Sequence, residues 1–210
     1  MENKKDSIGK RIRDSIVNAA NVYSGMTGKI YLYVCNEKYF ELLFATGSFK
    51  HLTGVASPLT AENFYEKAVK RKLTEKQIIF TSQNTIKKAK RKLPCLARLP
   101  ELTNSTICIV RDLKTDTLLY KIGLTNLEFT LGVAQPTFQN QYPVGVYIPR
   151  TLRIKDKAIE RSSDGDFVDF IFEKPTKSLD YPYEKLCYRR NDSAPPEIIR
   201  ALISEAFYKN

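Results

Sequence analysis

The fold is decided by residues 29–55, which read KIYLYVCNEKYFELLFATGSFKHLTGV. Residues 29–35 and 39–46 are rich in aliphatic and aromatic side chains, and only a short polar connector separates them, which predicts a β-hairpin. The glycines at positions 47 and 54 then bracket a short segment between the second strand and the next helix. A hairpin followed by helices and further strands is typical of an α+β domain.

Helical periodicity precedes this hairpin. Apolar residues recur at helical spacing from Ile8 to Tyr23, where Ser7 can cap the first turn and Gly25 can end the helix. We therefore expect an N-terminal helix over residues 1–24 and a single α+β domain over residues 25–210.

More helices are predicted after the hairpin. Residues 59–72 have inward-facing apolar positions at helical spacing, and a basic helix is predicted from about residue 83. Pro94 should stop or kink that basic helix, because proline cannot donate the backbone hydrogen bond.

The second half of the chain is rich in β-branched and aromatic runs, which predict strands at residues 106–113, 117–122, 127–134 and 144–148. Asp164-Gly165 is a hairpin signal that starts one long strand over residues 166–173. Pro195 and Pro196 precede a helical apolar pattern that predicts a last helix over residues 198–207. The predicted fold is α+β, with N-terminal helices packed on a twisted antiparallel sheet and a closing C-terminal helix.

The chain of 210 residues carries a formal charge of +11, four cysteines and one histidine. Its apolar runs fall far short of the roughly 18–20 residues that a bilayer span needs, and the charged N-terminus does not resemble a signal peptide.

The cysteines form no closely spaced pair, so we expect reduced core thiols, no metal site and no cofactor. Asp164 and Asp166, with Asp169 nearby, are compatible with a divalent cation, but the turn already explains Asp164 and Asp166. These features predict a cytoplasmic protein without a membrane partner.

Positive charge is concentrated between residues 65 and 98, where eleven basic residues stand against two acidic ones. Such a stripe favours a polyanionic partner, because each neutralised phosphate releases bound counterions. The pattern also fits a solvated helix face, in which Ile86, Ala89 and Leu93 form an apolar seam while the cations point into water. The candidate nucleic-acid contacts are Lys50, Lys87, Lys88, Lys90, Arg91 and Lys92.

His51 is the one imidazole of the chain, and it stands in the segment GSFKHLTGV. No phosphate-binding loop, dinucleotide motif or nucleophile elbow accompanies it. A lone histidine can be incidental. Here, however, Gly54 can bring backbone N–H groups close to an anion, while Thr53 adds a hydroxyl and Lys50 adds a charge. One histidine with lysine and arginine can serve metal-free RNA cleavage, which needs a base, an acid and cations around the phosphorane.

Several segments also carry a resemblance to a known family: residues 31–55, ENFYEKAVKRKLT at 62–74, KKAKRKLPCLARLP at 87–100, VYIPRTL at 146–152 and VDFIFEKPTKSLDYPYEKLCY at 168–188. The chain resembles the phage barnase–EndoU–colicin–RelE-like nucleases, specifically a subgroup with a Phe-x-His-Leu-Thr-Gly element, here residues 49–54. The resemblance covers roughly residues 25–190. It implies a compact ribonuclease fold of phage or mobile-element type and metal-independent RNA cleavage that leaves a 2′,3′-cyclic phosphate.

The resemblance also implies roles for individual residues. His51 would be the general acid or base, Thr53 a partner of the phosphate or the 2′-hydroxyl, and Lys174 the basic residue of the last long strand. Arg150 follows VYIP and can clamp the phosphorane, since arginine grips phosphate oxygens bidentately. For Arg150 and Lys174, the alternative is a charge that keeps a strand end soluble.

The chain offers no clear second acid or base. Tyr147 and Glu173 are the candidates. That gap leaves open a nuclease fold without catalysis.

Two other classes of function fit the sequence. A basic phage-type protein can bind and inhibit a host defence enzyme or ribonucleoprotein, an effect that would survive loss of His51. An RNA-binding module without turnover would use Tyr31, Tyr33 and Phe49 as stacking platforms, although such aromatic residues also build cores. The expected partners are therefore RNA, a host protein or ribonucleoprotein, or a cognate immunity protein that neutralises a toxin-like activity in the bacterial cytoplasm.

Overall fold

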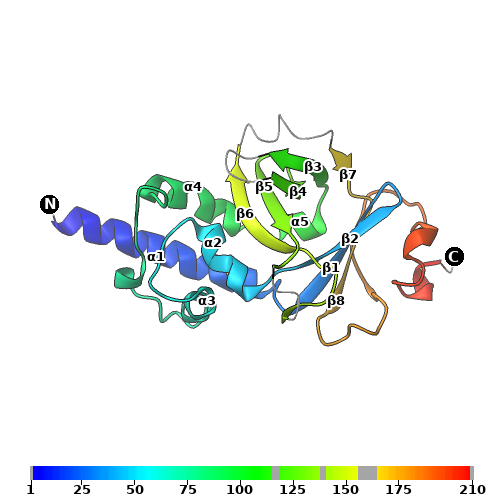
Figure 1. Cartoon of the computed structure of the whole chain (residues 1–210), viewed down its shortest axis with the longest axis horizontal. Helices are drawn as coiled ribbons and strands as arrows, with labels where there is room; N and C mark the ends of the chain where they lie inside the picture. The colour runs from blue at the N-terminus through cyan, green and yellow to red at the C-terminus, as the bar shows by residue number, and fades with distance from the viewer. Residues whose placement is uncertain (1, 115–118, 138–140, 156–164, 209–210) are drawn as a thin grey trace.

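The longer helices gather at one end of the molecule, whereas the strands and the short C-terminal helical turns lie toward the other (Figure 1). The computed structural model describes residues 2–114, 119–137, 141–155 and 165–208. The α-helices are α1 (Glu2–Ser24), α2 (Phe49–Thr53), α3 (Ala61–Val69), α4 (Ile86–Leu96) and α5 (Glu101–Asn104). Short 3-10 helices span Thr46–Ser48, Glu75–Gln77, Glu197–Ile199 and Glu205–Tyr208. The α+β class predicted from the sequence is confirmed.

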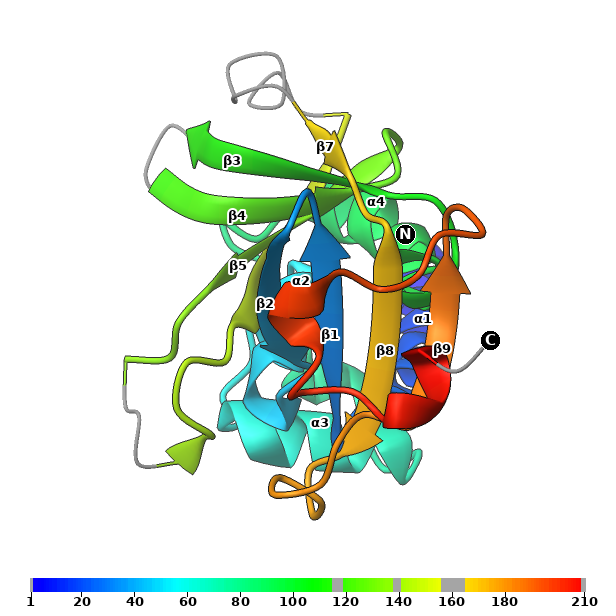
Figure 2. The same cartoon turned by 90° about the vertical axis from the view of Figure 1, so that its right-hand side faces the viewer.

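The strands form two antiparallel sheets (Figure 2). The first has the order β2-β1-β8-β9 and consists of β1 (Lys29–Cys35), β2 (Lys38–Leu43), β8 (Phe170–Pro175) and β9 (Lys185–Arg189). The second has the order β6-β5-β4-β3-β7 and consists of β3 (Cys108–Lys114), β4 (Leu119–Thr125), β5 (Phe129–Ala134), β6 (Ile148–Ile154) and β7 (Asp166–Phe167). The predicted hairpin is confirmed, because β1 pairs with β2 from Ile30↔Leu43 to Cys35↔Lys38.

The first sheet is buried on both faces, which explains why β1 is apolar at nearly every position. Tyr31 and Tyr33 belong to the larger core, which also contains the helices and the second sheet. Leu32 and Val34 point to the other face and join a smaller core under the C-terminal segment. The alternation follows from the two-residue period of a strand. Each residue of this sheet can thus be assigned to the helix side or to the C-terminal side.

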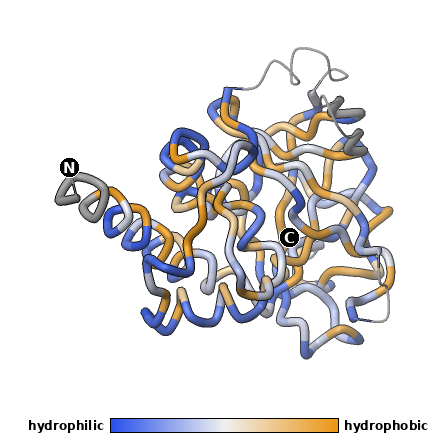
Figure 3. The backbone as a smooth tube through the Cα atoms, turned by 60° about the vertical axis from the view of Figure 1, so that its left-hand side comes forward, coloured by the Kyte–Doolittle hydropathy of each residue, from blue (hydrophilic) through white to orange (hydrophobic). Residues whose placement is uncertain are grey.

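Helix α1 supplies one wall of the larger core. Hydrophobic and hydrophilic stretches alternate along it (Figure 3), and its inward positions Ile12, Ile16 and Tyr23 are buried. The Tyr23 hydroxyl donates to the Ala45 carbonyl over 2.9 Å, which ties the helix to the end of the first hairpin. The helical periodicity seen in the sequence is therefore confirmed.

The single strand predicted over residues 166–173 is wrong. Residues 166–167 pair with β3 in one sheet, whereas β8 pairs with β1 and β9 in the other. Between them, the Val168 amide donates to the Ile107 carbonyl over 3.0 Å and the Asp169 amide donates to Val34 over 2.8 Å. The chain crosses between sheets here, which local β-propensity does not reveal. Asp164 of the expected turn lies outside the described residues.

The closing helix consists of two 3-10 helices instead of one α-helix. Ile199 and Ile203 are buried as predicted, but Ile198 is 53% exposed. The Tyr183 amide donates to the Leu202 carbonyl over 2.8 Å, and the Ser204 amide donates to the Tyr183 carbonyl over 2.9 Å. Backbone groups used in this bridge are unavailable to a continuous helix.

The strand expected at residues 144–148 is displaced. Val144 is 86% exposed, and β6 begins only at Ile148. Tyr147 makes an isolated parallel bridge with Leu42, so that this segment joins the first sheet before the chain enters the second. In the part of the chain that the structure describes, no helix is long and apolar enough to cross a membrane.

Candidate active site

His51 projects from α2, a single short helix set between the hairpin and α3. Phe49 and Leu52 of α2 are fully buried, which fixes the helix to the core and leaves the intervening His51 on the exposed side. The helix ends at Gly54, whose φ of 77° is left-handed and suits glycine. The local sequence therefore presents the imidazole from a rigid support.

Thr53 is fully buried, and its hydroxyl is used inside the protein. The hydroxyl donates to the Lys50 carbonyl over 2.7 Å and accepts from the Val55 amide at 3.3 Å. In this structure Thr53 stabilises the end of α2 and does not present its hydroxyl toward solvent. The role in phosphate binding that the family resemblance implied for Thr53 is thus not supported by its position.

Positive charges surround His51 from three elements. Burial lowers the pKa of His51 below its usual value of 6.5. Three neighbouring cations act in the same direction: Lys50, Arg150 and Lys92. The carboxylate of Glu62 acts in the opposite direction. His51 is therefore neutral at pH 7 and has a free lone pair to accept a proton.

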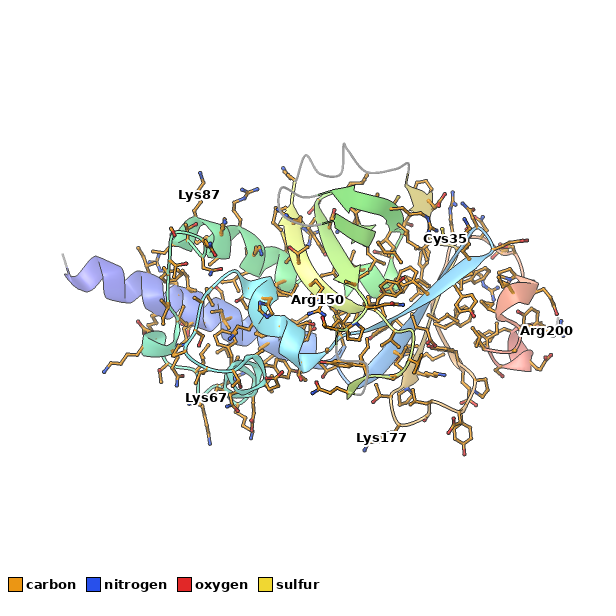
Figure 4. The ribbon with its side chains drawn as sticks, viewed as in Figure 1. Cys35, Lys67, Lys87, Arg150, Lys177 and Arg200 are labelled. Carbon is orange, nitrogen blue, oxygen red and sulfur yellow. The ribbon has the colours of Figure 1, made fainter. Side chains whose placement is uncertain are left out.

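Arg150 reaches this site from β6, which packs against both α2 and α4. Figure 4 shows it close to α2, between the helical end and the strands. Among the described residues, no carboxylate forms a salt bridge or hydrogen bond with its guanidinium. A half-buried arginine without a carboxylate partner is suited to an anionic ligand.

Lys92 of α4 is half-buried, and its environment disfavours the charged form. Burial lowers its pKa to about 8, and the charges of Arg153 and Lys88 contribute to the shift. Its side chain packs against Gly54, where a Cβ atom would stand 2.9 Å from the Lys92 Cδ. Gly54 thus serves two purposes, since it ends α2 and leaves room for this amine.

The sequence does not single out Glu62, the one carboxylate among the charges that shift the pKa of His51. It lies in the first turn of α3, after Thr60, whose hydroxyl accepts from the Asn63 amide over 3.2 Å. A Cβ atom on Gly47 would stand 2.6 Å from the Glu62 Oε1, so the carboxylate lies over the entry to α2. The spacing of Thr60 and Glu62 indicates an acidic first turn of a helix. Nothing in the sequence relates that turn to His51.

The other basic residues of the predicted interface differ in their surroundings. Ala89 and Leu93 of α4 are buried, whereas Ile86 is 38% exposed, so the apolar seam is narrower than expected. Hydrogen bonds to backbone carbonyls engage three of the cations: Lys50 to Leu59 at 2.7 Å, Lys88 to Gln83 at 2.8 Å and Arg91 to Ile154 at 2.9 Å. Lys87 and Lys90 are exposed, and Lys87 points away from the body of the molecule (Figure 4).

The structure does not bring Lys174 to His51. Lys174 pairs with Ile30 across the first sheet, and Ile30 belongs to the core on the C-terminal side. Its ammonium donates to the carbonyls of Leu179 and Tyr181 at 3.0 and 3.2 Å and lies 4.5 Å from the centre of the Tyr183 ring. Phe49 and Leu52 of α2 belong to the core on the opposite side.

The two candidates for a second acid or base are engaged with other residues. Glu173 binds Lys29 and Lys185, with nitrogen–oxygen distances of 3.3 and 2.8 Å. Tyr147 packs edge-on against Phe40, with ring centres 5.7 Å apart. Neither residue is among the groups that shift the pKa of His51.

The three aromatic residues considered as stacking platforms are part of the core. Tyr31 is 3% exposed, and Tyr33 and Phe49 are fully buried. The expectation that they stack on RNA bases is therefore wrong, and their alternative role in the core is confirmed. In the described part of the chain, no group of three or more acidic, histidine or cysteine side chains is arranged to hold a metal ion.

Comparison with known protein families gives one match. The family model described as phage-Barnase-EndoU-ColicinE5/D-RelE like nuclease4 matches residues 15–190. No curated protein and no solved structure matches the chain. The matched range contains the whole arrangement around His51.

Proposed function

The chain belongs to the phage-Barnase-EndoU-ColicinE5/D-RelE-like nuclease family, and on that premise we propose that it is a metal-independent endoribonuclease. Membership supports a nuclease-type activity in general. The proposal adds the substrate, RNA, and the reaction, attack of a 2′-hydroxyl on the adjacent phosphate. The products are a 2′,3′-cyclic phosphate and a free 5′-hydroxyl.

The observation that carries the proposal is a neutral imidazole next to cations that lack carboxylate partners. The pKa of His51 is lowered by burial and by Lys50, Arg150 and Lys92. A phosphate placed among these groups would relieve the repulsion between them and gain charge-assisted hydrogen bonds. The same site can therefore bind the anion and move protons.

The reaction needs two proton transfers, and two groups with displaced pKa values can perform them. Neutral His51 takes the proton of the 2′-hydroxyl as its oxygen forms a bond to phosphorus. The Lys92 ammonium, whose pKa is about 8, gives a proton to the 5′-oxygen as the bond between that oxygen and phosphorus breaks. Arg150 stabilises the negative charge of the phosphorane. The carboxylate of Glu62 favours the protonated form of the imidazole after the transfer.

The exposed cations of α4 extend the positive surface beyond the reacting groups. Lys87 and Lys90 are free to contact phosphates along a strand, which adds salt-dependent affinity without choosing a sequence. This interpretation keeps the basic stripe as a binding surface and assigns chemistry to the residues near α2 only.

RNA cleavage in EDTA tests the proposal directly. A mixed RNA pool is incubated with the wild type or with His51→Ala, and the ends of the products are identified chemically. We expect cyclic-phosphate ends with the wild type and a loss of about 10²–10⁴-fold in rate with the variant, as is usual for a general acid or base. DNA of the same sequence is the control, since it lacks the attacking hydroxyl.

Intact RNA with the folded wild type would contradict the endoribonuclease proposal. That result would favour the non-catalytic alternative, in which the protein inhibits a host enzyme or ribonucleoprotein. In that case His51→Ala would leave the biological effect unchanged, whereas reversal of the charges at residues 87–92 would abolish it.

A further inference from the structure

A groove of about 550 Å³ lies between the two sheets, away from the His51 side chain. It is lined by β2 of the first sheet, by β3 and β4 of the second, and by the segment that leads into β6; Figure 1 shows where β2 meets the second sheet. Ile109 and Ile122 are buried and form an apolar part of its wall. The volume is within the range of about 300–1,000 Å³ typical of small-molecule sites.

Aromatic side chains form one wall of this groove. Phe40 stacks on the buried Tyr33 ring with centres 5.1 Å apart and planes inclined by 7°. Tyr147 meets Phe40 edge-on at 5.7 Å. Tyr39 is 45% exposed at the rim. Because Phe40 is held between two partners, the wall is already ordered before a ligand binds, which lowers the entropy lost on binding.

Polar groups stand around the apolar part of the groove. Lys38 and Arg111 supply positive charge, and Glu41 supplies one carboxylate. Gln135 supplies an amide that can donate and accept hydrogen bonds. The Arg111 Nε lies 3.9 Å from an Asp166 oxygen and has about a third of its side chain exposed. Apolar and aromatic walls with an amide and cations at the rim suit a planar, polar-edged ring attached to a phosphate.

The backbone connects this groove to the candidate active site. The Tyr147 amide donates to the Glu41 carbonyl over 2.8 Å, and the Leu43 amide donates to the Tyr147 carbonyl over 2.9 Å, which fixes Tyr147 beside β2. Arg150 follows three residues later in β6. Since an extended chain spans at most about 3.3–3.6 Å per residue, the two Cα atoms lie within about 11 Å. One strand of RNA can therefore reach both places.

We propose that the groove between the sheets binds an unpaired base of the RNA strand whose scissile phosphate lies at His51 and Arg150. This inference rests on RNA being the substrate. The aromatic wall stacks the base, Gln135 contacts its edge, and Lys38 and Arg111 attract the adjoining phosphates. A base held there would place the strand so that a neighbouring phosphate reaches Arg150, and it would restrict binding to unpaired RNA.

Binding of an uncleavable RNA tests the proposal without depending on catalysis. The probe is a 2′-O-methyl oligonucleotide with the fluorescent base 2-aminopurine at one scanned position. Tyr147→Leu removes the stacking ring, whereas Tyr147→Phe keeps it. We expect Tyr147→Leu to weaken binding by about 5- to 50-fold and to remove the quenching of the base, given the usual strength of stacking on one aromatic side chain. Tyr147→Phe should bind within about twofold of the wild type.

Two further variants guard against a folding defect. Tyr39→Ala changes an exposed residue of the groove and should weaken binding in the same direction. Tyr181→Ala removes an aromatic side chain that is 68% exposed beside the C-terminal segment, and it should have no effect. The midpoint of thermal unfolding of each variant shows whether it is as stable as the wild type, so that its affinity for RNA can be compared.

The outcomes separate this inference from the proposed function. Wild-type cleavage of RNA together with unchanged binding by Tyr147→Leu and Tyr39→Ala would overturn the groove proposal and leave the nuclease proposal intact. Weakened binding by both variants without any cleavage by the wild type would support the groove and contradict the nuclease proposal. If the wild type does not bind the oligonucleotide, the groove proposal is overturned, and the cleavage assay alone decides the nuclease proposal.

Discussion

The lysines around Glu173 and those around His51 meet opposite conditions. In the first region the Glu173 carboxylate lies 3.3 Å from Lys29 and 2.8 Å from Lys185. Burial acts against the charge of Glu173, but the two lysines outweigh it and lower its pKa, while Glu173 raises the pKa of Lys185. In the second region Lys92 is half-buried among other cations, and its pKa falls to about 8.

The lysines beside Glu173 serve the structure, whereas the cations beside His51 are the ones we propose to serve the function. Lysines that satisfy a carboxylate need no further partner, so the Glu173 region is explained by the fold. Cations crowded around a neutral imidazole destabilise the folded state, and such local conflicts are typical of functional sites. We propose that an RNA phosphate supplies the missing negative charge.

The largest expected effect compares two cations. Arg150→Gln should lower the rate of RNA cleavage by about 10²–10³-fold, because it removes a group that stabilises charge in the transition state. Lys174→Gln should change the rate by less than about twofold, since Lys174 contacts the segment at residues 179–183 on the other side of the sheet. Single-turnover kinetics measure both. Equal losses of cleavage rate in the two variants would show that the region around His51 is no more important for catalysis than the region around Glu173.

The next prediction concerns pH. Because the pKa of His51 is lowered, its basic form should persist to below pH 6.5, and the acidic form of Lys92 should be lost above about pH 8. The cleavage rate should thus rise to a plateau in the acidic range and fall again near pH 8. Lys92→Ala should lose about 10²-fold in rate together with the alkaline fall. If the cleavage rate of Lys92→Ala still falls near pH 8, Lys92 is not the general acid.

Stability should respond in opposite directions in the two regions. The unfolded chain keeps the Lys92 proton up to an ordinary pKa of 10.5, but the folded chain only up to about 8. Stability therefore rises with pH between these values. Lys92→Met should raise the free energy of unfolding by roughly 1–3 kcal/mol below pH 8, since each pKa unit corresponds to about 1.4 kcal/mol. This gain should vanish above pH 10.5.

Glu173→Gln should act in the other direction. The lowered pKa of Glu173 contributes stability above the ordinary value of 4.5, and this contribution is lost as pH falls. We expect a loss of about 1–2 kcal/mol at pH 7, because the two lysines lose their charged partner. Urea unfolding at several pH values measures both variants, with Lys90→Met as an exposed control. A lower free energy of unfolding in Lys92→Met would show that the charge of Lys92 does not destabilise the folded state.

The smallest effect is expected at the exposed end of the basic helix. Lys87→Ala and Lys90→Ala should each weaken binding of an uncleavable RNA a few-fold and reduce the salt dependence of log Kd by about 0.7, the value for one phosphate of a single strand. Lys185→Ala serves as the control, since that lysine binds Glu173. An unchanged salt dependence would confine the RNA to the region near α2.

The sequence predicts those helices and strands that depend on local periodicity alone. The β1–β2 hairpin follows from two apolar runs with a short connector, and α1 follows from apolar residues at helical spacing. The division of residues 166–175 between two sheets depends on distant partners, β3 and β1, so a run of β-forming residues does not reveal it.

The candidate site shows the same limit. His51 stands out because it is the one histidine. Arg150 is suggested by the family resemblance, and the structure places it among the charges that lower the pKa of His51. Lys92 was predicted only as one cation of a stripe. Its special environment depends on Gly54, which packs against it from another helix. Glu62 could not be identified, since nothing in the order of residues relates it to His51.

Within the described part of the chain, the cations around His51 lack a negatively charged partner, and we propose that an anionic substrate supplies it. NMR titration of the imidazole tests it most directly, because a single histidine gives a single set of signals. We predict a pKa below 6.5 for His51 in the free protein and a clear rise when a 2′-O-methyl oligonucleotide binds. An ordinary pKa in the free protein that does not change on binding would contradict it.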